Sequence, residues 1–276
     1  MIPVSEGDDE RLAGYRHLIA GDRSSRHDRR SATFVVEGAR AIGRLLEEGW
    51  PTRSVLLSDR RAAARPDLVE AAEAAGVDVF VAPRDLFDGI AGYPVHRGAL
   101  ALAERPPERR PGEIVAGARL VLVVEAVNDF ENLGALFRNA AAFGAGAVLL
   151  DPRTADPLYR RCVRVSLGQV LRVPFARVGE WPSGLETLTA AGFTIVALTP
   201  AGDVAMDQAA GSVGGPVAVM VGSEADGLTP QALSWAGRAV RIPMAPGVDS
   251  LNVATAAAIG LHRFAGAAQV GPDRPA

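Results

Sequence analysis

Apolar and polar residues follow one another along the first hundred positions in short blocks. Four blocks have the length and apolar content of strands: 33–38, 53–59, 77–82 and 98–104. Apolar residues recur at helical spacing in the blocks between them: 39–49, 66–76 and 83–92. Residues 8–20 also have a helical pattern. This alternation of strand and helix favours a small α/β/α sandwich.

The same alternation returns after residue 118. Strands are expected at 119–127, 147–150, 173–178, 194–198, 217–222 and 240–244. Helices are expected at 131–144, 158–166, 183–191, 228–237 and 251–259. Thr229 is placed to cap the fourth of these helices, with Pro230 at its first position. Because the expected strands are continuously apolar, we predict a mostly parallel sheet covered on both faces.

A charged, proline-rich stretch separates the two halves. Residues 104–113 read ERPPERRPGE and have no apolar periodicity, which is typical of a linker. We therefore expect an N-terminal domain at 1–103, a linker at 104–113, a larger domain at 114–270 and a polar tail at 271–276. A chain of 276 residues is long enough for two such domains.

Charge leaves two interpretations open. The net charge is −3, and all 29 basic residues are arginine. Arginine binds phosphate through two parallel hydrogen bonds and stacks on bases, but a GC-rich coding bias explains the same excess. The segment 21–31 carries Arg23, Arg26, Arg29 and Arg30, and it is either a solvated surface loop or a loop that contacts RNA.

The single cysteine and the N-terminus bear on stabilisation and location. Cys162 has no partner for an internal disulfide, and we expect a half-buried packing role for it. The N-terminus is acidic and lacks the apolar core of a signal peptide. No apolar run is long enough to suggest a membrane span. We therefore expect a cytoplasmic protein with no membrane contact.

Unusual polar residues follow three of the expected strands in the second half, where open parallel sheets bind ligands. The most informative stretch is 242–259, IPMAPGVDSLNVATAAAI, in which a bent loop leads into an apolar helix. Ser250 is placed as the N-cap of this helix. Asn252 lies within the apolar run, where we expect a buried, hydrogen-bonded amide. An ordinary strand–loop–helix explains the same pattern.

The other two polar stretches follow the strands at 119–127 and 217–222. In NDFENLGALFR, acceptor side chains crowd the start of a helix, and Arg138 projects from the face that does not pack. In VMVGSEADGLTP, a tight turn after Gly222 presents Glu224 at the edge of the sheet. A solvated arginine and a plain turn are the ordinary explanations.

Several common chemistries lack their patterns. A dinucleotide fingerprint needs G-x-G-x-x-G at the start of a helix, and a P-loop needs the lysine that this chain lacks. The four histidines have no metal-ligand spacing, and no G-x-S-x-G is present. We therefore expect no metal, no nicotinamide cofactor and no serine nucleophile.

Taken in order, the three polar stretches resemble the motifs of the SPOUT superfamily, and specifically its SpoU (TrmH-type) branch of RNA 2′-O-ribose methyltransferases. The likeness covers about residues 119–266. FVVEGARAIGRLLEEG and HRGALALAE resemble the L30e-like substrate-binding domain that often precedes it. The resemblance implies a C-terminal trefoil-knotted α/β domain, mostly parallel with helices on both faces, and a smaller N-terminal α/β/α domain.

The resemblance also implies S-adenosylmethionine as cofactor and a homodimer with each active site near the subunit interface. By position, the expected cofactor-binding residues are Leu198, Thr199, Gly222, Ile242, Met244 and Leu251. The residues that match the catalytic positions are Arg138, Asn132, Glu224, Ser250 and Asn252. The chain departs from the pattern at Asn139, where many members carry threonine, and at NDF, which replaces a commoner aspartate–proline pair.

The implied reaction is an in-line attack of a ribose 2′-oxygen on a sulfonium methyl group. Because a guanidinium stays protonated in proteins, we expect Arg138 to bind an RNA phosphate and polarise the 2′-hydroxyl rather than act as the base. Asn132, Glu224 and Asn252 are expected to orient the ribose and Arg138.

The predicted function is S-adenosylmethionine-dependent ribose 2′-O-methylation of RNA. The substrate is expected to be 23S rRNA, because the L30e-like domain resembles rRNA-binding modules. The alternatives are a tRNA methyltransferase and a non-catalytic RNA-binding or ribosome-assembly factor of the same fold. From Arg153 to Arg177, six arginines stand against Asp151 and Asp156, which suits either RNA backbone contact or a solvated face.

Overall fold

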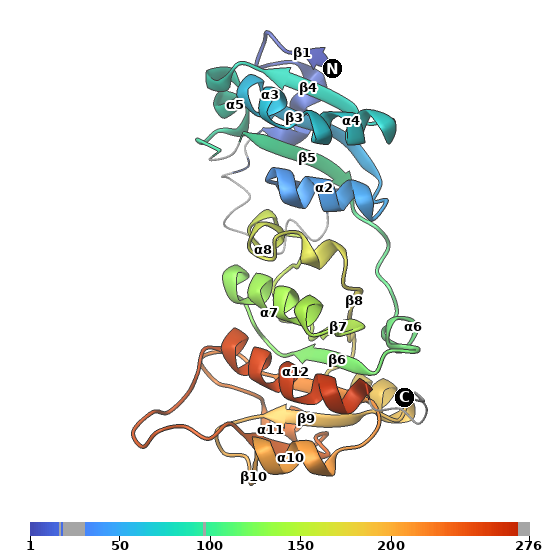
Figure 1. Ribbon diagram of the computed structural model, residues 1–276, viewed down its shortest axis with the longest axis vertical. Coiled ribbons are helices and arrows are strands. Elements are labelled where there is room, and N and C mark those ends of the chain that lie inside the picture. The colour runs from blue at the N-terminus through green and yellow to red at the C-terminus, as the bar shows by residue number, and fades with distance from the viewer. Residues whose placement is uncertain (17, 19–30, 96–97, 270–276) are drawn as a thin grey trace, which may run out of the picture. The chain divides into compact units, whose positions relative to one another are not determined.

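The computed structural model describes residues 1–16, 18, 31–95 and 98–269, which form two compact units (Figure 1). Unit 1 comprises residues 1–106 and 156–172, and unit 2 comprises 107–155 and the chain from 173 onward. Residues 156–172 therefore belong to unit 1, although they lie in the second half of the sequence. The arginines of segment 21–30 and the tail at 271–276 lie outside the described residues.

Unit 1 is built on a mixed sheet. Its strands are β1 (Ile2–Pro3), β2 (Thr33–Glu37), β3 (Thr52–Ser58), β4 (Asp78–Ala82) and β5 (Ala99–Glu104). Its helices are η1 (Glu10–Tyr15), α2 (Ala39–Glu47), α3 (Asp59–Ala64), α4 (Pro66–Ala74), α5 (Arg84–Ala91), α8 (Arg160–Val165) and η3 (Gln169–Leu171). The strand order is β1-β4-β3-β5-β2, with β5 antiparallel to both neighbours.

The helical pattern at 8–20 is realised as the short 3₁₀ helix η1. Leu12 and Tyr15 lie three residues apart and are both wholly buried, which matches the three-residue period of a 3₁₀ helix. The hydroxyl of Tyr15 donates to the backbone carbonyl of Ser54 at 2.8 Å. This bond satisfies a buried polar group and fixes η1 on the sheet.

Buried carboxylates hold the segment 156–172 in unit 1. Asp156 accepts a hydrogen bond from Arg105 at 2.7 Å, and Glu37 on β2 pairs with Arg164 of α8 at 3.1 Å. Both carboxylates are almost wholly buried. A buried carboxylate without its arginine is strongly unfavourable, so these pairs resist separation of the segment from unit 1.

Unit 2 is built on a seven-stranded sheet. Its strands are β6 (Leu120–Val124), β7 (Ala147–Leu150), β8 (Phe175–Arg177), β9 (Thr194–Leu198), β10 (Val204–Ala205), β11 (Val217–Val221) and β12 (Arg238–Arg241). Its helices are α6 (Pro111–Val115), α7 (Phe130–Ala142), η4 (Ser183–Leu185), α9 (Glu186–Ala190), α10 (Met206–Ser212), α11 (Pro230–Leu233) and α12 (Val253–Gln269). The order is β10-β12-β9-β11-β6-β7-β8, and each neighbouring pair is parallel.

Helices cover both faces of the unit 2 sheet, which explains why its strands are continuously apolar. Val121 and Val123 of β6 face a core shared with α6, α9 and α11. On the opposite face, α7 and α12 pack against each other and α12 crosses β11 and β6 (Figure 1). A Cβ at Gly260 would lie 2.7 Å from Leu198 Cδ1, so glycine permits the close approach of α12 to β9.

Three features differ from expectation. Helix α6 begins at Pro111, inside the segment expected to be a linker, because proline fits a first helical turn and Ile114 is buried. The almost wholly apolar run 251–259 predicts a helix that packs on nearly all sides, but α12 exposes Thr255 and Ile259 within one chain. Cys162 is wholly buried rather than half-buried, and this burial raises the pKa of its thiol.

Candidate functional site

Polar segments converge at one edge of the unit 2 sheet. The strands β12, β9, β11 and β6 are parallel neighbours in that order. Their carboxyl ends therefore share an edge, and the segments 125–129, 222–229 and 242–252 all begin there. The three polar stretches of the sequence are thus brought together by the strand order.

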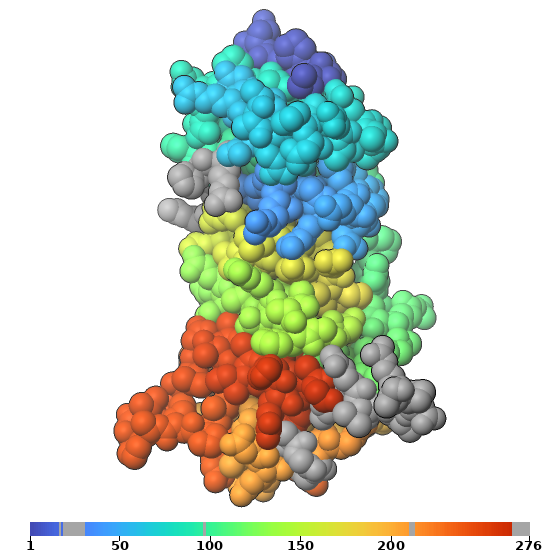
Figure 2. Space-filling model, viewed as in Figure 1, coloured from blue at the N-terminus to red at the C-terminus, as the bar shows by residue number. Residues whose placement is uncertain are grey.

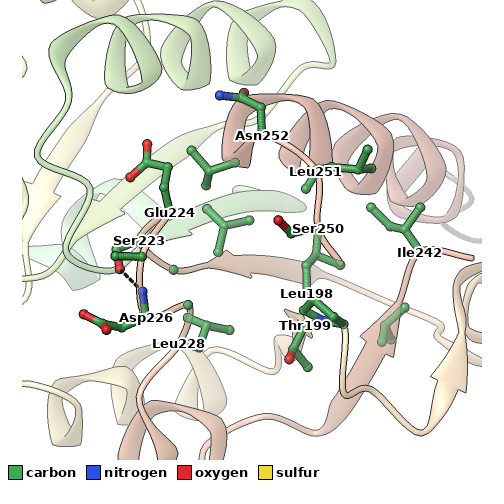
Figure 3. A pocket seen from close by; sticks show the side chains of 18 of the residues that line it. Leu198, Thr199, Ser223, Glu224, Asp226, Leu228, Ile242, Ser250, Leu251 and Asn252 are labelled. Carbon is green, nitrogen blue, oxygen red and sulfur yellow. Dashed lines mark hydrogen bonds between the residues drawn. The ribbon is translucent and has the colours of Figure 1, made fainter. Parts of the chain in front are cut away.

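A pocket of about 510 Å³ lies at this edge (Figure 3). Nine sequence-predicted residues line it, including all six expected to bind a cofactor: Leu198, Thr199, Gly222, Glu224, Ile242, Met244, Ser250, Leu251 and Asn252. Asn132 and Arg138 are not part of the lining. In Figure 3, Glu224 and Leu228 lie on one side of the pocket and Leu198 and Thr199 on the other, with the hydroxyl of Ser250 pointing between them.

The pocket combines aliphatic walls with acidic groups. Glu224 and Asp226 are the acidic members of its lining, and no basic side chain is found among the lining residues that the structure describes. Leu198, Val221 and Ile242 contribute aliphatic surface. Such a pocket suits a ligand with an apolar body and a positive charge.

The turn after β11 is closed so tightly that it requires glycine at its start. A Cβ at Gly222 would lie 2.1 Å from the carbonyl carbon of Gly227 and 2.4 Å from the nitrogen of Leu228. Ser223 closes the turn by accepting the backbone N–H groups of Gly227 at 3.0 Å and, on its hydroxyl, of Asp226 at 3.2 Å. Gly222 therefore allows a close approach to Gly227 and Leu228 of the same chain.

Asn252, and not Ser250, caps α12. The helix begins at Val253, and Asn252 Oδ1 accepts the backbone N–H groups of Ala254 at 2.9 Å and Thr255 at 3.2 Å. The prediction for Ser250 was wrong because the chain is not yet helical at residues 250–252, and the amide oxygen of Asn252 reaches two unpaired helix N–H groups. For the same reason Asn252 is exposed at the helix end rather than buried inside it.

A chain of side-chain hydrogen bonds connects the three polar segments. Asn252 Nδ2 donates to Asn132 Oδ1 at 2.8 Å, and Asn132 Nδ2 donates to Glu224 Oε1. Because the α12 amides fix the oxygen of Asn252, its nitrogen faces Asn132, and the nitrogen of Asn132 must face Glu224 in turn. Glu224 is therefore held through one oxygen, and its Oε2 is left to accept a hydrogen bond from a ligand.

Helix α7 carries the other expected residues. Asp129 caps the helix by accepting the backbone N–H of Asn132 at 2.8 Å. Arg138 is exposed, and it makes no hydrogen bond or ion pair within the described parts of the chain. Asn139 donates Nδ2 to the carbonyl oxygen of Ala254 at 2.8 Å, which ties α7 to the first turn of α12.

A buried carboxylate that sequence reasoning missed lies beside the pocket segments. Glu125 is wholly buried and accepts hydrogen bonds from Trp181 Nε1 at 2.7 Å and from the N–H and hydroxyl of Thr229 at 2.9 and 2.7 Å. Arg153 pairs with it at 3.3 Å. Thr229 directly follows Leu228, which lines the pocket, so Glu125 anchors the end of that segment. The signal in the sequence is an acid immediately after the apolar run VLVV.

Most of the arginines from 153 to 177 are engaged within the chain. Arg153 pairs with Glu125 and Asp151, Arg160 and Arg164 pair with Glu37, Arg172 pairs with Glu48, and Arg177 donates to the backbone carbonyls of residues 151, 154 and 155. The local arginine excess therefore serves internal contacts to a large extent.

The described residues include neither a metal-ligand cluster nor a helix that could span a membrane. No group of three His, Cys, Asp or Glu side chains in that part of the chain could hold a metal ion. No helix there has both the length and the apolar character needed to cross a membrane.

The sequence matches two family models and is similar to known methyltransferases. The sequence model of the SpoU rRNA methylase family matches residues 119–262. A second model, described as RNA 2′-O ribose methyltransferase substrate binding, matches residues 35–109. An uncharacterized tRNA/rRNA methyltransferase of Mycobacterium bovis is 41% identical over 94% of this chain and 90% of its own length.

Two solved structures are also similar to this chain. The AdoMet-bound rRNA methyltransferase from Sinorhizobium meliloti has a TM-score of 0.79 at 24% identity, covering 95% of this chain and 96% of that one. A structure described as an RNA 2′-O ribose methyltransferase has a TM-score of 0.74 at 27% identity, covering 95% of this chain and 97% of that one. At 24% identity, the first similarity concerns the fold.

Proposed function

The chain belongs to the SpoU rRNA methylase family, and from this premise we propose that it transfers a methyl group from S-adenosylmethionine to a ribose 2′-hydroxyl of 23S rRNA. One observation carries the proposal. The acid-lined pocket in unit 2 lies beside a hydrogen-bonded chain, Asn252–Asn132–Glu224, that unites three separate segments at the sheet edge. This arrangement supports a site for a cationic donor next to fixed polar groups that can orient a hydroxyl.

The pocket has a chemistry that fits S-adenosylmethionine. The molecule combines an adenosine body with a sulfonium cation and a zwitterionic end, so its net charge is positive, and the lining combines aliphatic walls with Glu224 and Asp226. We assign its binding to Leu198, Thr199, Gly222, Ile242, Met244 and Leu251. The AdoMet-bound structure from S. meliloti, which shares the fold, supports this assignment. When bound, the cofactor supplies an electrophilic methyl group on sulfur.

The chain's own residues would then align and polarise the acceptor. Asn132 and Asn252 fix the orientation of Glu224, whose Oε2 accepts a hydrogen bond from a ribose hydroxyl. The Ser250 hydroxyl, which points into the pocket, contributes a further donor or acceptor (Figure 3). Arg138 binds an RNA phosphate through its guanidinium, and the proton of the 2′-hydroxyl passes to that phosphate or to a neighbouring one.

The substrate assignment rests on unit 1. The match of residues 35–109 to the substrate-binding model supports RNA as the substrate. We favour rRNA over tRNA because the family model that matches residues 119–262 is described as an rRNA methylase family. The M. bovis relative is named as a tRNA/rRNA methyltransferase, so tRNA is the alternative to be tested.

We further propose a homodimer. Arg138 is exposed and does not line the pocket of its own chain, which supports a site completed at a subunit interface. Ile259 leaves apolar surface on α12, adjacent to α7, that a second subunit would cover. The cytoplasm, where rRNA is found, is the proposed location.

A trefoil knot also belongs to the proposal. The segment 242–252 leaves the end of β12, which lies two positions from β11 in the order of the sheet. Asn252, at the end of this segment, nevertheless hydrogen-bonds Asn132, which follows β6 on the other side of β11. A segment 242–252 that passes through a loop of the same unit would connect these positions. In Figure 2 the orange-red atoms of this exposed segment project from the edge of unit 2.

Calorimetric titration with S-adenosylmethionine, followed by transfer of a labelled methyl group to unmodified rRNA and tRNA, tests the function. We expect binding, and label in large-subunit rRNA at one nucleotide whose 3′ linkage becomes resistant to alkali. Label in tRNA alone would change the substrate class. Absence of cofactor binding by folded protein would favour the non-catalytic RNA-binding factor.

A further inference from the structure

Unit 1 contains a pocket of its own, with a volume of about 190 Å³. Segments distant in sequence line it: Arg16 follows η1, Thr33 lies on β2, Arg105 follows β5, and Tyr159 precedes α8. The substrate-binding model begins at residue 35 and ends at 109, so it includes neither Arg16 nor Tyr159. The pocket therefore exists only because residues 156–172 fold into unit 1.

The charge of this pocket is opposite to that of the pocket in unit 2. Arg16, Arg105 and Arg160 line it, and none of its described lining residues is acidic. Arg105 pairs with Asp156 at 2.7 Å, while Glu37 is shared between Arg160 and a second arginine of α8. Three arginines in a lining whose described residues include no acid favour an anionic ligand.

Arg16 supplies an independent observation. Its Nη2 donates to the backbone carbonyl of Asp9 at 2.6 Å, but its Nε is buried and has no hydrogen-bond partner in the described part of the chain. A buried N–H without an acceptor is rare and unfavourable. The hydroxyl groups of Ser31 and Thr33 line the same pocket and can also donate to an anion.

We propose that this pocket binds one phosphate group of the RNA substrate, with Arg16 Nε as a donor. The inference rests on the proposed function, because RNA is taken as the source of the phosphate. Phosphate oxygens provide the acceptor that Arg16 Nε lacks and the negative charge that three lining arginines favour. The contact would hold the RNA on unit 1 without reading its sequence, as phosphate contacts do.

Arg11, on η1, provides a matched control for Arg16, which directly follows this helix. It is exposed, and its Nε and Nη2 already bind the carboxylate of Asp9 at 3.0 and 2.6 Å. It does not line the pocket. Arg11→Gln and Arg16→Gln therefore remove the same charge from the same part of unit 1, but only Arg16→Gln removes the proposed phosphate donor.

The experiment measures the affinity of the full chain for a fragment of large-subunit rRNA over a series of salt concentrations. For Arg16→Gln we expect RNA binding to weaken several-fold. The slope of log affinity against log salt concentration is negative, and we expect its magnitude to decrease by about one. For Arg11→Gln we expect the wild-type slope. S-adenosylmethionine binding should be unchanged in both variants. Equal slopes for the two variants would overturn the proposal.

A second measurement on the unaltered protein covers the case in which Arg16→Gln does not fold. The Nε–H signal of Arg16, assigned by nuclear magnetic resonance through its backbone, should shift when the RNA fragment is added. No shift, or a shift with inorganic phosphate but not with RNA, contradicts an RNA phosphate site. Failure of the proposed function would be seen separately, as absent cofactor binding and absent methyl transfer by the wild type.

Discussion

The side-chain nitrogen of Asn252 lies 2.8 Å from the side-chain oxygen of Asn132, although 120 positions separate the two residues. The side-chain oxygen of Asn252 is itself held by the first backbone amides of α12, and Asn132 orients Glu224 by donating a hydrogen bond to it. The helix terminus, the start of α7 and the turn after β11 are therefore coupled. A change in any one of these residues should disturb the other two.

Asn132→Asp should abolish most of the methyl transfer. The substitution places a carboxylate oxygen where Asn132 Nδ2 now faces Glu224, and two carboxylates at this separation repel each other or share a proton. We expect the turnover number to fall about 100-fold, as small misplacements of reacting groups do. The dissociation constant for S-adenosylmethionine should change little, because Asn132 does not line the pocket.

Asn128→Asp is the matched control for this substitution. Asn128 lies four residues earlier, in the loop before α7, and its side chain donates to the carbonyl of Ala126 at 3.2 Å. Near-wild-type turnover is expected for it. An Asn132→Asp enzyme that is as active as Asn128→Asp would show that the hydrogen-bonded chain has no role in the reaction.

Gly222→Ala should weaken cofactor binding strongly. The added Cβ would lie 2.1 Å from the backbone of Gly227, so the turn that carries Glu224 must open. Titration calorimetry should show a loss of affinity of at least about tenfold. Gly214→Ala is a suitable control, because a Cβ at Gly214 meets nothing within 4 Å. Equal affinities for the two variants would mean that the turn is not part of the cofactor site.

Glu125→Gln should reduce stability and also affect the pocket. The new amide nitrogen would replace one carboxylate oxygen and face a donor in either orientation: Trp181 Nε1 at the Oε1 position, or the backbone N–H of Thr229 at the Oε2 position. We expect the free energy of unfolding in urea to fall by about 1–3 kcal/mol, the usual cost of an unsatisfied buried group. Glu186→Gln, at an exposed position on α9, should have no measurable effect.

Thr229→Ser links this stability effect to the pocket. Serine keeps the hydroxyl that donates to Glu125 at 2.7 Å and accepts from Ala232 at 3.2 Å, whereas valine removes it. Thr229→Val should therefore weaken S-adenosylmethionine binding, and Thr229→Ser should retain it. Equal binding by both variants would restrict Glu125 and Thr229 to a role in stability.

Arg138→Lys should separate charge from geometry. Lysine keeps the positive charge but loses the planar fork that contacts a phosphate through two hydrogen bonds. We expect turnover to fall about tenfold to 100-fold with unchanged cofactor affinity. Near-full turnover by the lysine variant would contradict a bidentate phosphate contact.

Mixing two inactive variants tests whether Arg138 acts across a subunit interface. Arg138→Ala and Glu224→Gln homodimers should each be inactive. If each site combines Glu224 of one subunit with Arg138 of the other, co-refolded heterodimers contain one intact site and activity returns. If both residues serve the site of their own chain, no site is intact and activity stays absent.

The local sequence pattern was sufficient to predict a large part of the fold. The apolar runs around Val121 and Val219 predicted buried strands, and Thr229 with Pro230 predicted the start of α11, where the structure shows Thr229 accepting from Ala232. These features depend on residues within a few positions of one another, so the sequence alone is enough to reveal them. The three polar stretches were found in the same way.

Contacts between distant residues could be decided only by the tertiary structure. The apolar pattern placed the helix cap at Ser250, but the fold brings Asn252 to the helix start and against Asn132. Glu125 falls inside the strand expected at 119–127, and only the fold brings Thr229 and Trp181 to its carboxylate. Residues 156–172 lie within the second half of the sequence, yet the buried carboxylates of Glu37 and Asp156 require their arginines and so hold that segment in unit 1. Local periodicity carries no information about such partners, because the free energy of a buried charge depends on which distant group meets it.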